Sequence, residues 1–169
     1  MIGILLVMHG RLGEVLLETL VHVVGPQAQI ECLAVTDHDD PVGLKPQADE
    51  AVARLDTGAG VLVLTDIFGS SPSNLALSLR QAERVEVLAG ANVPMLVKLA
   101  KSRACLDLTG CIDVAMLAGR KYIAAASQLP NPCLQGGPRS ACDASVKVTR
   151  PRGRRIRNWY RPRASSLLS

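Results

Sequence analysis

Residues 2–10 read IGILLVMHG, and this stretch decides the fold. From Ile2 to Met8 it forms a continuous apolar run, as in a strand that is buried on both faces, and the run ends abruptly at His9 and Gly10. Strands of this kind occur in parallel sheets that carry helices on both sides. The stretch therefore predicts the opening strand of such a sheet.

Strand and helix patterns alternate along the rest of the chain. Further short strands are expected at 29–35, 60–65 and 85–89, and helices at 12–24, 45–55, 72–82, 93–100 and 112–127. Such alternation argues for parallel strands, because parallel neighbours are joined by helical crossovers. The predicted fold class is α/β: a doubly wound, mainly parallel sheet of four to five strands with helices on both faces.

Composition changes sharply near residue 130. Residues 131–169 hold nine Lys and Arg against one acidic residue, a net charge of +8, so residues 1–130 carry −4 in a chain whose net charge is +4. The segment 131–169 has no apolar periodicity and too few apolar residues to pack. We expect one mildly acidic domain, residues 1–130, and a basic, mostly disordered tail, residues 131–169.

Several classes of protein are disfavoured. No apolar run reaches the ~18 residues of a membrane helix and no signal-peptide pattern opens the chain, which predicts a cytoplasmic protein without membrane insertion. The five cysteines form no CxxC pair or metal-ligand pattern, so reduced thiols and no metal site are expected. Aromatic residues are too few in the body of the chain for base stacking, so specific nucleic-acid binding is not expected; nonspecific binding through the basic tail stays an alternative.

Residues directly after each strand are the candidates for chemistry, because ligands of open parallel sheets bind beyond the carboxyl ends of the strands. His9 follows the first strand, and Gly10 lets a partner approach it closely. Asp66 stands at the equivalent end of strand 60–65, where its carboxylate could accept an imidazole N–H, fix the tautomer and raise the nucleophilicity of the other nitrogen. We predict that these two side chains form one catalytic site.

The segment that follows Asp66 adds anion chemistry. In residues 69–74, GSSPSN, Ser71 is expected to be the N-cap of the next helix and Pro72 its first residue, so that free N–H groups point into the crevice of His9. A helix start with small hydroxyl residues favours a phosphate. The predicted phosphate-binding residues are Gly69, Ser70 and Ser71.

Two other polar groups are weaker candidates. His22 lies within the first predicted helix, where a surface or core-edge position is expected. The run DHDD at residues 37–40 could ligate a metal ion, but a solvated loop is favoured, because no further carboxylates converge on it with a clear spacing.

With these residues identified, about residues 1–128 resemble the mannose/fructose-type enzyme IIA family of the phosphoenolpyruvate-dependent sugar phosphotransferase system. The resemblance is carried by the end of the first strand, MHG at residues 8–10, by TDIFGSSPSN at residues 65–74 and by GANVPML at residues 90–96. It implies that His9 is a phosphorylated histidine, that Asp66 is its carboxylate partner and that Ser71 is a hydroxyl near the phosphate.

The same resemblance implies partners. The phosphoryl donor of the family is the histidine phosphocarrier protein and the usual acceptor is an enzyme IIB; members pair as homodimers, often with an exchanged C-terminal strand, and use no metal or organic cofactor. The expected function is therefore that of a phosphotransferase carrying a phosphoryl group on His9 in sugar uptake. A regulatory phosphohistidine module without sugar delivery and the phosphotransferase subunit of a dihydroxyacetone kinase are the alternatives, and segment 69–74 favours the sugar system over the kinase subunit.

Overall fold

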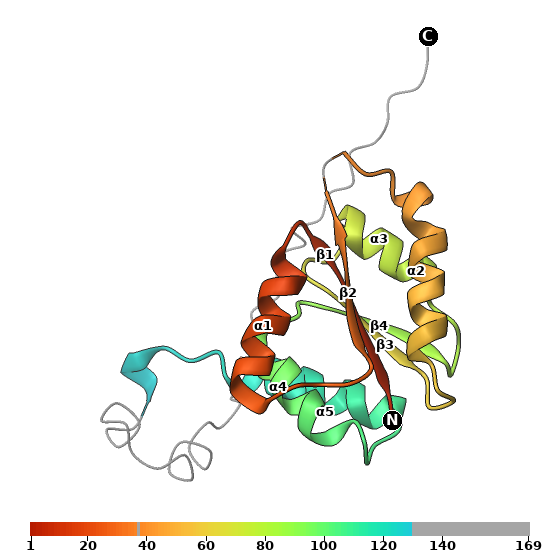
Figure 1. Ribbon diagram of the computed structural model, residues 1–169. Helices are drawn as coiled ribbons and strands as arrows, with labels where there is room; N and C mark the ends of the chain where they lie inside the picture. Colours follow the sequence, from red (N-terminus) through yellow and green to blue (C-terminus); the bar gives the residue numbers. More distant parts are fainter. Residues whose placement is uncertain (37, 130–169) are drawn as a thin grey trace, which may run out of the picture. The chain divides into compact units, whose positions relative to one another are not determined.

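Four parallel strands form a single sheet in the computed structural model, which describes residues 1–36 and 38–129 (Figure 1). The strand order is β2-β1-β3-β4, so the first strand lies inside the sheet. This order confirms the predicted doubly wound α/β class, with four strands in the described part of the chain. The strands are β1 (Gly3–His9), β2 (Ile30–Val35), β3 (Val61–Thr65) and β4 (Val85–Ala89).

Within the described residues, five α-helices cover the two faces of this sheet. Helices α2 and α3 pack on one face, and α1, α4 and α5 pack on the other, as Figure 1 shows. Described residues 1–125 form one compact unit, and the short 3-10 helix η1 (Ala126–Gln128) belongs to the next. The expected tail, residues 131–169, lies outside the described residues. The helices are α1 (Leu12–Val24), α2 (Pro41–Leu55), α3 (Ser71–Ser78), α4 (Val93–Ser102) and α5 (Leu108–Lys121).

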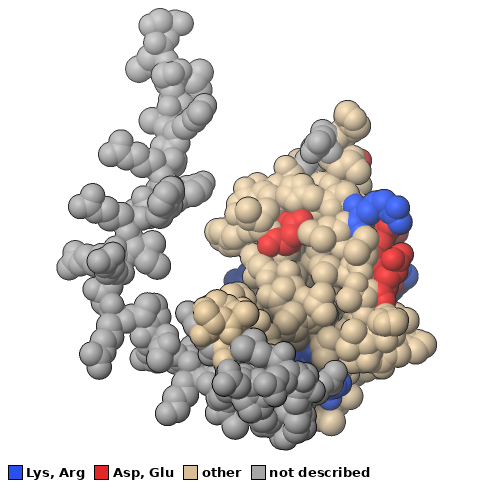
Figure 2. Space-filling view, turned by 90° about the vertical axis from the view of Figure 1, so that its left-hand side faces the viewer, with Lys and Arg blue, Asp and Glu red and all other residues tan. Residues whose placement is uncertain are grey.

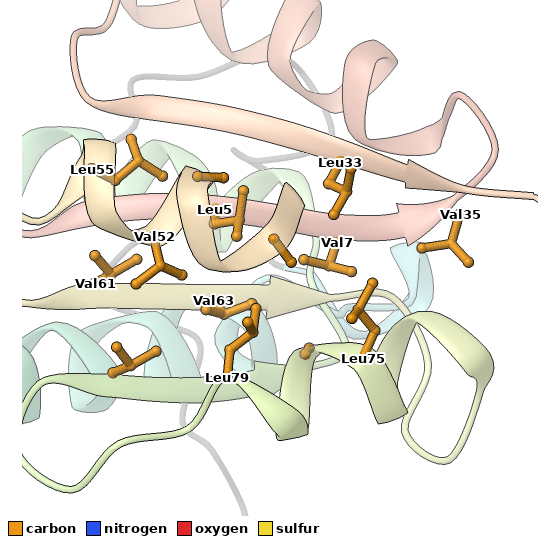
Figure 3. Packing of buried hydrophobic residues seen from close by; sticks show 14 residues of the cluster. Leu5, Val7, Leu33, Val35, Val52, Leu55, Val61, Val63, Leu75 and Leu79 are labelled. Carbon is orange, nitrogen blue, oxygen red and sulfur yellow. The ribbon is translucent and has the colours of Figure 1, made fainter. Parts of the chain in front are cut away.

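The central strands alternate between two hydrophobic cores. In β1, Leu5 and Val7 pack with α2 and α3, and Figure 3 shows them beside Val52 and Leu75. Leu6, one position along, belongs to the core under α1, α4 and α5. Each fully buried side chain of this size contributes about 1.5–3 kcal/mol. Because both faces of β1 are buried, its side chains stay apolar until the strand ends at the site.

Two helices begin earlier than their apolar periodicity predicts, because an aspartate caps each of them. Asp40 accepts a hydrogen bond from the main-chain N–H of Val42 at 3.0 Å, so α2 begins four residues before the expected start. Asp107 accepts from Gly110 at 2.7 Å and opens α5 in the same way. Helix α5 ends at Lys121 and not at 127, because the alanines that follow are exposed and bring no packing to extend it.

Arg103 ties together the amino ends of the strands. Its side chain is 2% exposed, and its guanidinium donates to the carbonyl oxygens of Ile2 (3.2 Å), Gln29 (2.9 Å) and Ala28. The carbonyl of Arg103 in turn accepts from the N–H of Ile2. Burial lowers the pKa of this guanidinium. One buried cation therefore satisfies three main-chain carbonyls from two separate parts of the chain.

Charged side chains are sparse on the face of the molecule shown in Figure 2, where they form separate groups in an otherwise uncharged surface. Helix α1 adds exposed apolar side chains to the surface, among them Leu12 and Val23, which are 43% and 49% exposed. The described residues that Figure 2 leaves uncovered thus offer few cations to a polyanion such as nucleic acid.

Candidate functional site

His9 is the last residue of β1 and the first side chain of that strand to reach solvent, with 46% of the side chain exposed. The next residue, Gly10, has φ +48° and donates its N–H to the carbonyl of Val35 at 3.0 Å. A Cβ added at Gly10 would meet no atom within 4 Å, so the space beside the imidazole is open. The ring therefore stands at the carboxyl edge of the sheet, within reach of a partner.

Asp66 follows β3, the neighbour of β1, and its carboxylate is 12% exposed. Its Oδ2 lies 2.9 Å from the His9 Nδ1 and accepts the main-chain N–H of His9 at the same distance. Its Oδ1 accepts the N–H of Ile67 at 2.7 Å. The contact between His9 and Asp66 matches the sequence prediction, whereas nothing in the sequence signalled the main-chain bond from His9.

The charge state of Asp66 determines the tautomer of His9. Burial alone would raise the pKa of the Asp66 carboxyl, but the hydrogen bonds from the His9 main chain, the His9 ring and Ile67 together hold it below its ordinary value. An ionised carboxylate only accepts hydrogen bonds, so the His9 Nδ1 carries the proton. In the neutral ring, Nε2 then has a free lone pair. The site thus presents an oriented nitrogen nucleophile to solvent.

The turn between β3 and α3 differs from the sequence prediction in its cap. Ser70, and not Ser71, is the N-cap: its hydroxyl accepts from the Ser73 N–H at 3.4 Å, and Pro72 is the second helical residue. Ser70 has the extended backbone that a cap requires, whereas Ser71 is already helical. Helix α3 ends at Ser78 and not at 82, because the chain after it turns back so that Gln81 pairs with Val85.

The three predicted phosphate-binding residues differ from one another in whether their hydrogen-bond donors are already engaged. The N–H of Gly69 donates to the Ser73 hydroxyl at 3.2 Å, and the Ser70 hydroxyl donates to the carbonyl of Ile67 at 2.8 Å, so both groups are engaged. Ser71 is exposed, and its N–H and hydroxyl have no hydrogen-bond partner within the described residues. Of the three, Ser71 has the donors most available to an anion.

The loop after β4 supports the site from the other side. The N–H of Gly90 donates to the Asp66 carbonyl and that of Ala91 to the Thr65 carbonyl, both at 3.1 Å. Asn92 caps α4 by accepting from Met95 at 3.1 Å. This loop also borders a hollow of about 220 Å³ between β4, α4 and α5. The segment 90–96 therefore holds the backbone of Asp66 in place.

The weaker candidates, His22 and the described residues of the run 37–40, are not among the residues that hydrogen-bond to His9 and Asp66. His22 is exposed in the last turn of α1. Asp39 accepts from the N–H and hydroxyl of Thr36 at 2.7 Å each, and Asp40 caps α2, so these two acids shape the loop; Asp37 is outside the described residues. Nowhere in residues 1–36 and 38–129 are three or more His, Cys, Asp or Glu placed to hold a metal ion.

None of the helices in that part of the chain is long and apolar enough to cross a membrane.

Comparison with protein families gives one match over most of the described chain. The family model described as PTS system fructose IIA component matches residues 3–116, a range that contains His9 and Asp66. Among curated proteins, the PTS system mannose-specific EIIAB component of Escherichia coli (strain K12) is 35% identical over 103 residues, which are 60% of this chain and 32% of that protein. The match thus spans about a third of the length of this relative.

Solved structures of phosphotransferase-system proteins share this fold. The phosphotransferase system component EIIA from Streptococcus agalactiae has a TM-score of 0.68 at 24% identity, covering 75% of this chain and 98% of that one, which shows the shared fold. The PTS IIA protein associated with the fucose utilization operon of Streptococcus pneumoniae has a TM-score of 0.60 at 28% identity, covering 80% and 96%.

Proposed function

The chain belongs to the EIIA-man family of PTS system fructose IIA components, and from this membership we propose that it carries a phosphoryl group on His9 between two proteins of a sugar phosphotransferase system. One observation carries the proposal: the His9 Nδ1 lies 2.9 Å from the Asp66 carboxylate, which leaves Nε2 as the nucleophile on a side chain that is 46% exposed. The donor is the histidine phosphocarrier protein and the acceptor is an enzyme IIB.

The proposed step is an in-line phosphoryl transfer. The Nε2 lone pair of His9 bonds to phosphorus while the bond from phosphorus to the donor's histidine nitrogen breaks, and that nitrogen keeps the electron pair. Positive charge develops on the His9 ring, where the Asp66 carboxylate stabilises it through Nδ1. The N–H and hydroxyl of Ser71 are the donors proposed for the phosphoryl oxygens. The step invokes no metal or organic cofactor.

Phosphoryl uptake by the full chain tests this function. Incubation with phosphoenolpyruvate, enzyme I and the histidine phosphocarrier protein is expected to add one acid-labile phosphoryl group, about 80 Da by intact mass, on the peptide that contains His9. The exposed histidines offer matched controls, and His22→Gln and His38→Gln are expected to keep the full gain. No gain, or an adduct on another residue, would overturn the proposal.

Asp66→Asn tests the role proposed for the carboxylate. The amide is neutral, so it stabilises the charge on the phosphorylated ring poorly, and its NH₂ can favour the wrong tautomer of His9. We expect the single-turnover rate of uptake to fall by about 10²–10⁴-fold. Quenched-flow mass spectrometry measures this rate, with Asp113→Asn on the exposed side of α5 as the control. A rate within threefold of the wild type would show that Asp66 does not take part.

The acceptor, the quaternary state and the location of the protein rest on family membership. We propose a cytoplasmic homodimer in which residues 1–130 form the phosphoryl-carrying domain. Loss of the phosphoryl group from His9 on addition of an enzyme IIB would favour sugar delivery over a purely regulatory role.

A further inference from the structure

Two large apolar side chains stand exposed beside His9, on the turn that follows Asp66. Ile67 is 62% exposed and Phe68 is 74% exposed. Phe68 is the single phenylalanine of the chain, and an aromatic ring left in water forgoes about 25 cal/mol for each Å² that burial would remove. Phe68 is therefore exposed near the nucleophile, although burial in a hydrophobic core would have been more favourable.

The turn that carries Phe68 is tied down on both sides. The N–H of Ile67 donates to the Asp66 Oδ1 at 2.7 Å, and the Ile67 carbonyl accepts from the Ser70 hydroxyl at 2.8 Å. Beyond Phe68, Gly69 adopts φ +86° and donates its N–H to the Ser73 hydroxyl. Because the backbone of this turn is already fixed, covering Phe68 with a partner costs little more than the conformational entropy of its side chain.

Helix α3 and the first half of α4 carry no charged side chain. The sequence has no Lys, Arg, Asp or Glu in residues 67–79 or in residues 87–97. The second segment contacts the residue that precedes the first, because the Gly90 N–H donates to the Asp66 carbonyl at 3.1 Å. These two segments offer no cation to hold a small, highly charged phosphoryl donor; the cation that lines the hollow beside Gly90 and Asn92, Arg120, comes from α5. An apolar patch on a protein would match these two segments.

We propose that Phe68, supported by Ile67, is the docking anchor for the phosphoryl donor protein, and that its ring enters an apolar depression next to the donor's phosphorylated histidine. The inference rests on the proposed function. A specific interface buries about 800 Å² on each partner, a disc of roughly 16 Å radius. Phe68 lies two residues from Asp66, within about 7 Å along the chain. A donor centred on the His9 Nε2 must therefore cover it, and rigid central aromatics dominate binding energy.

The test separates docking from chemistry. Single-turnover uptake by the full chain is measured against the concentration of the phosphorylated donor protein, which gives a half-saturating concentration and a limiting rate. For Phe68→Ala we expect the half-saturating concentration to rise about tenfold to thirtyfold and the limiting rate to change by less than about threefold. Phe68→Leu, which keeps most of the apolar volume, is expected to restore most of the affinity.

Val23→Ala is the matched control. Val23 is an exposed apolar residue about 16 Å farther along α1 than Leu12, at the opposite edge of the sheet from His9, and its truncation is expected to leave both constants unchanged. An unchanged half-saturating concentration for Phe68→Ala, or a fall confined to the limiting rate, overturns the anchor while wild-type uptake still supports the proposed function. Absence of uptake in the wild type overturns both.

Discussion

His9→Gln is expected to take up no phosphoryl group, with a rate at least about 10⁴-fold below that of the wild type. Glutamine can still donate a side-chain N–H toward Asp66, but it offers no nitrogen lone pair with which to attack phosphorus. Intact mass after incubation with phosphoenolpyruvate, enzyme I and the histidine phosphocarrier protein measures the loss.

The same variant is expected to fold as the wild type does, which makes its loss of uptake specific. Its main-chain N–H can still donate to the Asp66 Oδ2, and nearly half of the His9 side chain already lies in solvent. The midpoint of thermal unfolding should therefore stay within a few degrees of the wild type. An acid-labile adduct on His9→Gln at a rate within tenfold of the wild type would contradict the assignment of the nucleophile.

Arg103→Met is expected to lower the free energy of unfolding by about 3–5 kcal/mol, the largest stability effect that the described structure implies. The methionine fills much of the same space but donates no hydrogen bond, so the carbonyls of Ile2, Ala28 and Gln29 lose the buried donors they now have. Small domains are stable by only about 5–15 kcal/mol, so a large part of the stability would be lost. Urea unfolding at neutral pH measures this change.

Arg80→Met is the surface counterpart of that substitution. Arg80 is 55% exposed and forms a surface ion pair with Glu86 at 3.0 Å, so its loss is expected to leave the free energy of unfolding near that of the wild type. Arg103→Lys keeps the positive charge but not the planar set of guanidinium N–H donors, so its free energy of unfolding should lie between those of the wild type and Arg103→Met. A cost for Arg103→Met below about 1 kcal/mol would show that other donors or water replace the guanidinium.

The strands and the two central site residues could be predicted because one physical constraint dominates them. The two central strands, β1 and β3, are buried on both faces and stay apolar almost to their ends, so the end of the apolar run marks His9 in β1 and leads, after Thr65, to Asp66 beyond β3. The carboxyl ends of neighbouring parallel strands share one edge of the sheet, so the two residues had to lie close together.

The parts that were missed depend on information that a local pattern does not contain. The starts of α2 and α5 are set by capping aspartates that precede the apolar periodicity. The choice of Ser70 over Ser71 as cap depends on which hydroxyl reaches Ser73. Arg103 could not be recognised, because the carbonyls that it binds lie 74 to 101 residues away in the sequence.

The exposure of the His9 ring also bears on how long the proposed phosphoryl group would stay on it. With almost half of the side chain in solvent, water has access to the bond between phosphorus and nitrogen. Enzymes that protect a reactive intermediate from hydrolysis close a lid over it, whereas this nitrogen stands uncovered at the edge of the sheet. Under the proposed function, the lifetime of phosphorylated His9 is therefore set by the competition between hydrolysis and transfer of the phosphoryl group to the acceptor protein.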